Sequence, residues 1–253
     1  MGSATTKTVV LGADLAVLAR DVRRSGVDLA AAADASLDAA LRACGASRGD
    51  LRSIVATGFG RANVPFAHAR RTEIACHGRG AYHMLRRAMT VVDVGGQDSK
   101  IIRMAADGRQ IGFRMNRKCA AGTGAFLEEI ARRLDVPTAE LDALARRASD
   151  PTVTLSSYCT VFAATEVLSR IRQGVGAPDL ARAAFDSVAV RVVETDRIEG
   201  DAALTGGVAE HCPIFADLLA RRLGVRPIVP DHAQSIGALG AALFGSDMSG
   251  VSG

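Results

Sequence analysis

The chain has 253 residues, 48% of them hydrophobic, and its 31 basic and 27 acidic residues give a formal net charge of +4. The two signs are interspersed along the chain, which is typical of a solvated surface and argues against a nucleic-acid-binding protein. The sequence has no run of the ~20 apolar residues that a membrane helix needs. It also shows no secretory signal, so we expect a cytoplasmic protein without membrane contact.

The first ninety residues predict a small α/β unit. Leu29, Leu37 and Leu41 recur on one face of a helix, and Gly45 follows where that helix should end. Short apolar runs on either side are typical of strands. The expected strands are 9–11, 16–18 and 53–56, and the expected helices are 28–44 and 73–87.

From residue 90 the same order of elements recurs on a larger scale. Asp107-Gly108 separates two apolar runs, which is a strong hairpin signal. The expected strands are 90–94, 101–104, 111–115, 202–204 and 227–229, and the expected helices are 124–134, 138–148, 164–173, 178–198 and 235–243. This repeated pattern predicts two related α/β lobes, one of residues 1–89 with 235–253 and one of residues 90–234.

The strongest phosphate-binding pattern is the octet DVGGQDSK, which starts at Asp93 and ends at Lys100. Gly95 and Gly96 follow a buried-type strand and let the backbone turn tightly around an anion, although two glycines alone also suit an ordinary hairpin turn. The Asp93 carboxylate can hold Mg²⁺ through water, and Gln97 or Asp98 can orient an attacking water. Lys100 supplies a compact charge suited to phosphate, and the whole octet therefore favours a nucleotide site.

Two further glycine motifs are candidates for the same ligand. A segment of small hydroxyl residues and one lysine precedes the strand at 9–11, where it suits a phosphate-binding hairpin, although it is not a Walker loop. A second motif, TGGVA, turns from a strand into a helix and lets the backbone approach a base or ribose. The residues expected to contact nucleotide here are Gly2, Ser3, Thr5, Lys7, Gly206 and Gly207.

Five cysteines, at positions 44, 76, 119, 159 and 212, form no CxxC pair. An odd number in a cytoplasmic chain argues against a disulfide framework and leaves core thiols, a reactive thiol or metal ligands. Free cysteine is usually a small buried hydrophobe, which we expect of Cys44, Cys76 and Cys212. Cys119 lies in a polar, glycine-flanked segment ahead of a predicted helix, and Cys159 has a similar setting forty residues later.

Four separated motifs together resemble one protein family. The stretches DVGGQDSK, NRKCAAGTG, CTVFAATEV and TGGVA occur in this order and look like those of the activators of 2-hydroxyacyl-CoA dehydratases. The ATPase subunits of benzoyl-CoA reductases share the same motifs. The stretches TGFGR and TEIACHGRGA are similar too, so the resemblance covers nearly the whole chain.

The resemblance implies the two-lobed α/β ATPase fold of actin, heat-shock chaperones and sugar kinases, with ribonuclease-H-like lobes. It implies ATP and Mg²⁺ as ligands and one [4Fe–4S] cluster held by Cys119 and Cys159 of each of two subunits, in a homodimer or a pseudo-symmetric heterodimer. Such a cluster takes four thiolates, so two per chain demand a second chain. The implied activity couples ATP hydrolysis to electron transfer into an acyl-CoA dehydratase or reductase component, with ferredoxin or flavodoxin as the electron donor.

Three departures from the family pattern accompany the resemblance. A first strand ending in Asp-x-Gly-Ser is usual, but here Gly2-Ser3 follows Met1 directly, so the first strand is expected to be truncated. Arg117 stands where an Asp is usual, and Ala164 where a Glu is common. Two other functions fit the sequence: a small-molecule kinase on the same fold, which gives no reason for two polar-flanked cysteines, and a truncated non-catalytic partner subunit.

Overall fold

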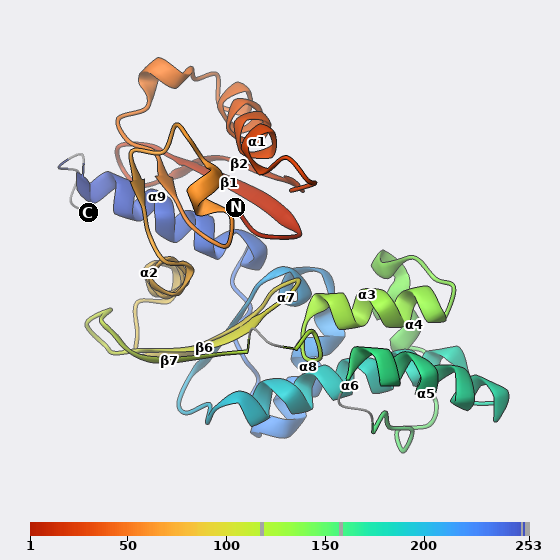
Figure 1. Ribbon diagram of the computed structural model, residues 1–253. Helices are drawn as coiled ribbons and strands as arrows, with labels where there is room; N and C mark the ends of the chain where they lie inside the picture. The colour runs from red at the N-terminus through yellow and green to blue at the C-terminus, as the bar shows by residue number, and fades with distance from the viewer. Residues whose placement is uncertain (117–118, 157–158, 249, 251–253) are drawn as a thin grey trace. The chain divides into compact units, whose positions relative to one another are not determined.

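A computed structural model describes residues 1–116, 119–156, 159–248 and 250. The chain divides into two compact units (Figure 1). Unit 1 comprises Met1–Ala88, Arg103–Ile111 and Ser235–Gly253, and unit 2 comprises Met89–Ile102 and Gly112–Gln234. Among the described residues, no helix is both long and apolar enough to cross a membrane.

Unit 1 begins with an antiparallel hairpin of β1 (Thr5–Leu11) and β2 (Val17–Arg24). Helix α1 (Leu29–Ala43) packs on it, and its apolar face joins Val10 and Ala19 in one core cluster. The Asp28 carboxylate caps this helix by accepting a hydrogen bond from the Ala31 N–H group, because that N–H has no partner within the helix. The predicted helix is therefore present with its expected ends, whereas β2 is longer than the predicted strand.

The rest of unit 1 is built around two helices that cross at very short range. Short parallel strands β3 (Val55–Ala56) and β4 (Ala69–Arg70) lead into α2 (Glu73–Leu85), which packs against α9 (Ile236–Met248). A Cβ added to Gly240 would overlap the Cys76 carbonyl oxygen, so this glycine lets the two backbones touch. Unit 1 contains 3₁₀ turns at Arg48–Asp50 and Arg61–Asn63, and a further 3₁₀ turn, Ala233–Ser235, includes the last residues of unit 2 and the first of the final segment of unit 1.

Unit 2 is centred on a four-stranded sheet with the order β7-β6-β5-β8. Its strands are β5 (Met89–Val94), β6 (Ser99–Met104), β7 (Gln110–Asn116) and β8 (Ala202–Thr205). β5 and β8 are parallel, with Asp93 opposite Thr205, and β5 is buried along its whole length. Gly108 has a φ of 82°, as the predicted turn at Asp107-Gly108 requires. The tip of the β6–β7 hairpin belongs to unit 1, where Tyr82 Oη donates a hydrogen bond to the Ala106 carbonyl.

Helices pack together beside this sheet (Figure 1). They are α3 (Gly124–Arg133), α4 (Leu141–Ala145), α5 (Thr160–Arg172), α6 (Ala177–Thr195), α7 (Gly207–His211) and α8 (Pro213–Leu223), with a 3₁₀ turn at Thr138–Glu140. Helix α6 lies at the centre of the core, where Leu180, Phe185 and Val188 are fully buried against α3, α4 and α8.

Three expectations for unit 2 were wrong in detail. The predicted helix 138–148 is a 3₁₀ turn followed by the short α4, and the predicted strand 227–229 is a single bridge between Ala203 and Ile228. Helix α5 starts at Thr160 and not at residue 164, because burial of Ala163 and Val167 outweighs the weak helix propensity of its first residues. Helix α8 was not predicted, although Pro213 at its first position is a favourable start signal.

Candidate functional site

Two glycine turns of unit 2 lie at the same edge of the sheet. Gly95-Gly96 follows β5 and Gly206-Gly207 follows β8, and these strands are parallel neighbours in register. In open α/β sheets, ligands bind outside the carboxyl ends of such strands. The motifs at 93–100 and 204–209, which are more than a hundred residues apart in sequence, therefore form one candidate site.

A buried charge network lies beneath this edge. Asp93 is 2% exposed and Lys100 is 3% exposed, and the Lys100 Nζ atom lies 3.0 Å from Asp93 Oδ2. Thr205 Oγ1 donates to the other Asp93 oxygen at 3.1 Å, and Lys100 also bonds Asp98 Oδ1 at 2.5 Å. A buried charge is tolerated only when it is paired and hydrogen-bonded, as both charges are here. Lys100, expected to contact phosphate, is thus placed against two carboxylates.

The turn after β5 is fastened to helix α3. The Gly95 N–H donates to the Asp98 carbonyl at 3.0 Å, which closes the turn and leaves the Gln97 side chain exposed. The Gly95 carbonyl accepts from the Gly124 N–H at 2.9 Å, and the next carbonyl, of Gly96, accepts from the Ala125 N–H at 2.8 Å. These two N–H groups belong to the first turn of α3, whose donors have no partner inside the helix. The turn and the start of α3 therefore form one hydrogen-bonded piece.

The turn after β8 depends on glycine for two reasons. Gly206 has a φ of 96°, and a Cβ added there would lie 2.8 Å from Asp93 Oδ1, so a side chain is excluded by conformation and by space. The Gln234 side chain lies over Gly207 and pairs with His211 Nε2 at 3.0 Å. The Glu210 carboxylate accepts from the Gln234 N–H at 2.7 Å and fixes the same segment. This side of the edge is therefore closed by polar groups.

The predicted contacts at the amino end belong to unit 1, which is described by itself. The Gly2 N–H donates to the Thr5 carbonyl at 3.1 Å, and Ser25 Oγ donates to the Gly2 carbonyl at 2.6 Å, so residues 2–5 form a turn tied to β2. Thr5 and Lys7 alternate with the buried Thr6 on β1 and are half-buried on its other face, and Ser3 is half-buried in the turn. This geometry is compatible with the expected phosphate contacts of Gly2, Ser3, Thr5 and Lys7, which remain a prediction.

Cys119 lies in a turn between β7 and α3. Its thiol is exposed, and the Asn116 Nδ2 atom donates to the Cys119 carbonyl at 3.0 Å and to the Ala121 carbonyl at 3.3 Å. Gly122 has a φ of 87° and packs against Arg191, which turns the chain toward α3. Helix α3 begins five residues after this cysteine, with Thr123 as its N-cap, at the residue where the helix was expected to start.

Cys159 is the N-cap residue of α5, and its carbonyl accepts from the Ala163 N–H at 2.8 Å. Its thiol is half-buried and makes no side-chain capping bond, so it stands at a helix end where the partial positive charge favours an anionic group. A helix end therefore lies next to Cys159, whereas five residues separate Cys119 from the start of its helix. Arg117 lies outside the described residues, and Ala164 is buried in the core of unit 2.

The other three cysteines are structural. Burial raises the pKa of Cys76 above its ordinary value, and burial, helped by the nearby Asp142 charge, raises the pKa of Cys212 to about 12. Cys44 Sγ donates to the Ala40 and Leu41 carbonyls inside unit 1. No cluster of three or more metal-binding side chains occurs in the described part of the chain. Cys119 is exposed and Cys159 is half-buried, as is Cys44, which was expected to be buried.

The arrangement of glycine turns on parallel strands can be compared with known proteins. A model of the BadF/BadG/BcrA/BcrD ATPase family matches residues 1–245. The chain belongs to this family. It is 38% identical over 247 residues to the activator of lactoyl-CoA dehydratase from Anaerotignum propionicum, an alignment that covers 96% of this chain and 94% of that protein.

Solved structures agree with this membership in the ATPase family. The activator of the 2-hydroxyisocaproyl-CoA dehydratase from Clostridium difficile, solved with bound ADPNP, is 34% identical with a TM-score of 0.93, and the match covers 99% of this chain and 93% of that one. A ROK family glucokinase from Streptomyces griseus is 13% identical to this chain, with a TM-score of 0.56, and the match covers 98% of this chain and 97% of that one. At this level of identity the likeness shows a common fold and nothing about function. The expected family and its actin-like, sugar-kinase-like fold are confirmed.

Several residues of this family member were not singled out from the sequence. Thr205 bonds Asp93, and Gly124 and Ala125 bond the turn after β5. Asn116 and Glu166 hold the segments next to Cys119 and Cys159. Gly124 is the last residue of NRKCAAGTG, so its position in a glycine motif was the available signal, whereas the partners of the other residues depend on tertiary contacts.

Proposed function

We propose that this chain is an ATP-hydrolysing activator that drives a low-potential electron into an acyl-CoA dehydratase or reductase component. Membership in an ATPase family and similarity to an ADPNP-bound activator support the nucleotide part. The printed names of its relatives refer to dehydratase activators, which supports an acyl-CoA dehydratase as the partner. The substrate is then the partner's, and this chain supplies the energy coupling.

The nucleotide part of the proposal uses the edge formed by β5 and β8. Gly95, Gly96, Gly206 and Gly207 let the backbone approach ATP, because these residues carry no side chain of their own. Asp93 is assigned to Mg²⁺ through water, and the exposed Gln97 to the attacking water. Water then attacks the γ-phosphate, and ADP and inorganic phosphate leave. Lys100 balances the charge of Asp93. The nucleotide contacts expected of Gly2, Ser3, Thr5 and Lys7 in unit 1 stay a separate prediction.

One observation carries the coupling. The Gly95 and Gly96 carbonyls accept from the first two N–H groups of α3, and the Cys119 turn leads directly into that helix. A change in the phosphate-binding turn must therefore displace α3 or break these two hydrogen bonds. ATP and ADP can shift this arrangement only if they differ in affinity for its two forms, which a γ-phosphate at the turn supplies.

The metal part of the proposal rests on the chemistry of the donor set. Cys119 and Cys159 are accessible, and the remaining thiols are buried or bonded within unit 1. Two thiolates from each of two subunits would complete a [4Fe–4S] cluster in a homodimer, or in a heterodimer with a related subunit. When bound, this cluster supplies one low-potential electron at a time. Ferredoxin or flavodoxin is the proposed reductant, and the cytoplasm the proposed location.

Anaerobic purification tests the proposal directly. We expect about four irons per dimer, an EPR signal after reduction, and MgATP hydrolysis. Cys119→Ser and Cys159→Ser should each abolish the signal, whereas Cys44→Ser, which changes a thiol bonded within unit 1, should retain it. A colourless monomer that still hydrolyses ATP contradicts the cluster and favours a small-molecule kinase. A brown dimer without ATPase activity contradicts the coupling and favours a non-catalytic partner subunit.

A further inference from the structure

The two cysteines assigned to the cluster are attached to different parts of unit 2. Cys119 precedes α3, and Cys159 begins α5. The contacts that hold the two segments run to separate elements, so nucleotide binding need not affect both cysteines equally. The inference developed below deepens the proposed function and rests on its assignment of these two ligands.

The Cys119 segment is continuous with the phosphate-binding turn. Asn116 bonds the Cys119 and Ala121 carbonyls, and Thr123 Oγ1 donates to the Ala120 carbonyl at 2.6 Å. The helix that follows donates its first two N–H groups to the turn after β5, as described above. Short hydrogen bonds therefore connect the nucleotide side of unit 2 to Cys119 without a flexible interruption among the described residues 119–125.

The segment before Cys159 is bonded to α6 instead. The Asp179 Oδ1 atom accepts from two consecutive backbone N–H groups, those of Ser149 and Asp150, each at 2.8 Å. One turn later on α6, Arg182 Nη2 donates hydrogen bonds to the Pro151 carbonyl at 2.7 Å and to the Val153 carbonyl at 2.9 Å. Four charge-assisted bonds from one helix thus fix this segment, and such bonds are stronger than those between neutral groups.

Glu166 fastens the end of the same segment to α5. Its carboxylate accepts from the Ser156 N–H at 3.0 and 3.1 Å and from the Ser156 hydroxyl at 3.0 Å. Ser156 precedes Cys159 by three residues and Glu166 follows it by seven on α5, so this carboxylate joins the chain on both sides of the cysteine. Arg170, one turn further, lies 3.9 Å from the carboxylate and adds a favourable charge.

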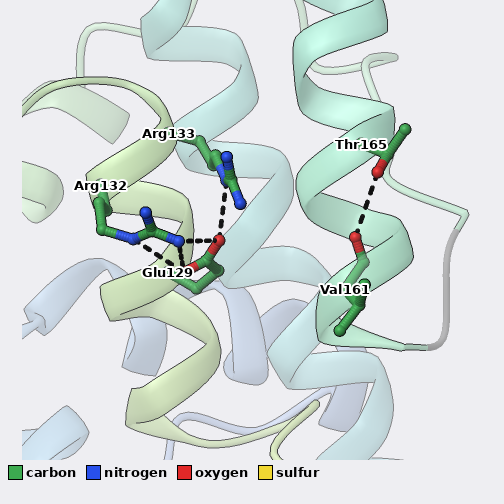
Figure 2. Close-up of polar contacts among 5 residues, drawn as sticks. All are labelled: Glu129, Arg132, Arg133, Val161 and Thr165. Atoms are coloured by element: carbon green, nitrogen blue, oxygen red, sulfur yellow. Dashed lines mark hydrogen bonds and ion pairs between the residues drawn. The ribbon is translucent and has the colours of Figure 1, made fainter.

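The helices that provide these anchors belong to the core of unit 2. Ala163 and Val167 of α5 are fully buried, as are Leu180 and Phe185 of α6. Helix α3 belongs to the same core through Phe126 and Ile130, so the two cysteine segments differ in their polar contacts and not in the burial of their helices. Figure 2 shows α3 with Glu129, Arg132 and Arg133 beside α5 with Val161 and Thr165, so the two helices lie next to each other and carry different polar contacts.

We propose that Cys159 is the fixed ligand of the pair and Cys119 the ligand that moves with nucleotide. Glu166 is the positioning residue of Cys159, with Asp179 and Arg182 as its support on α6. The phosphate-binding turn acts on Cys119 through α3. Nucleotide exchange therefore changes the distance between the two thiols of one chain by displacing one of them, which alters how that chain grips a shared metal group.

Thiol alkylation of the iron-free full-length chain tests this asymmetry. The protein is stripped of iron with a chelator, and the rate of iodoacetamide labelling at each cysteine is followed by peptide mass spectrometry. We expect Mg²⁺ with ADPNP to change the rate at Cys119 several-fold and to leave the rate at Cys159 unchanged. Equal changes at both cysteines, or no change at either when ADPNP is bound, would overturn the proposal.

Substitutions at Glu166 test the anchor separately. Glu166→Ala should raise the labelling rate of Cys159 about tenfold, the equivalent of ~1.4 kcal/mol, because the Ser156 bonds are lost. Glu166→Gln retains one acceptor oxygen and should give a smaller rise, which keeps the test valid if the alanine variant unfolds. Glu129→Gln is the matched control, since that carboxylate on α3 bonds Arg132 and Arg133, and it should leave Cys159 labelling unchanged.

These outcomes separate the two proposals. Iron and an EPR signal with equal nucleotide effects at both thiols leave the proposed function intact and overturn the asymmetry. Asymmetric labelling in a chain that never binds iron supports the mechanical difference and overturns the cluster assignment. An unchanged Cys159 rate in both Glu166 variants, with the fold retained by circular dichroism, excludes Glu166 as the positioning residue.

Discussion

Glycine allows close approach in both units, but the neighbouring groups differ. In unit 1, Gly240 of α9 lies against the Cys76 carbonyl of α2, where the backbones of two helices meet. In unit 2, Gly206 has a positive φ and lies beside the Asp93 carboxylate. The first glycine is required by packing, and the second by backbone conformation next to a buried charge network.

The comparison separates stability from function. The helix crossing of unit 1 brings together the backbones of two helices, so a change there should alter the free energy of unfolding and little else. The edge of unit 2 combines stability with the proposed nucleotide site, since Asp93, Lys100 and Thr205 support the turns that contact the ligand. Substitutions in the two places should therefore differ in kind as well as in size.

The largest effect is expected from breaking the charge network. Asp93→Ala removes the buried one of the two carboxylates that pair with Lys100, and it should lower the free energy of unfolding by ~3 kcal/mol and abolish ATPase activity. Urea unfolding and phosphate release measure the two effects. The double variant Asp93→Ala with Lys100→Met should regain part of the stability and none of the activity. A double variant no more stable than the single one would contradict the ion-pair account.

A packing change in unit 1 should come next. Gly240→Ala should lower the free energy of unfolding by about 3 kcal/mol, because two helix backbones must separate to admit the methyl group. The control is Gly224→Ala, where a positive φ is the only obstacle and no atom lies within 4 Å, so the loss should be about 1 kcal/mol. If thermal or urea unfolding showed equal losses of unfolding free energy for Gly240→Ala and Gly224→Ala, the close contact between the two helices would not explain the effect at Gly240.

A smaller and purely functional effect is expected at the turn of unit 1. Lys7→Met should weaken ADPNP binding about tenfold through loss of a charge-assisted phosphate contact. Its effect on unfolding should be within ~0.5 kcal/mol, as for most surface substitutions. Arg24→Met removes the same charge from the exposed partner strand and is the matched control. Calorimetric titration showing the same affinity for both variants would rule out a phosphate contact for Lys7.

The smallest effect at neutral pH concerns Cys212. Burial raises the pKa of the Cys212 thiol from 9.0 to about 12. Between these two pH values the folded state keeps the thiol proton, whereas the unfolded chain releases it. Stability should therefore be unaffected below about pH 9 and should fall as the pH rises toward 12. Cys212→Ala should reduce that fall when urea midpoints are compared across this range. An identical pH profile for both proteins would show that other groups cause the loss.

Much of the sheet edge formed by β5 and β8 could be predicted because its signals are local. The octet from Asp93 to Lys100 combines a buried-type strand, two glycines and charged residues within eight positions. The pairing of Lys100 with Asp93 was not foreseen, since a lysine beside glycines was assigned to phosphate. Helix α8 was missed because its apolar residues were not weighed as a helical pattern, although Pro213 marked its start.

The two cysteine segments show the same division. Sequence context separated Cys119 and Cys159 from the remaining thiols, since polar and glycine residues surround one and a helix follows the other. It placed Cys119 next to a helix end, whereas the structure gives that position to Cys159. The anchors at Asp179, Arg182 and Glu166 lie ten to thirty-one residues from the groups they bond, so no local pattern reveals them.

By itself the sequence determined the fold family, the order of most strands and helices, and the glycine motifs of the nucleotide site, because these depend on short-range spacing and backbone freedom. Tertiary structure alone decided which strands are neighbours, which charges are paired and which thiols are accessible. Those properties depend on burial and on contacts between distant segments. Such contacts join the Gly95 and Gly96 carbonyls to the helix that follows Cys119, and they join the Glu166 carboxylate to the segment that precedes Cys159.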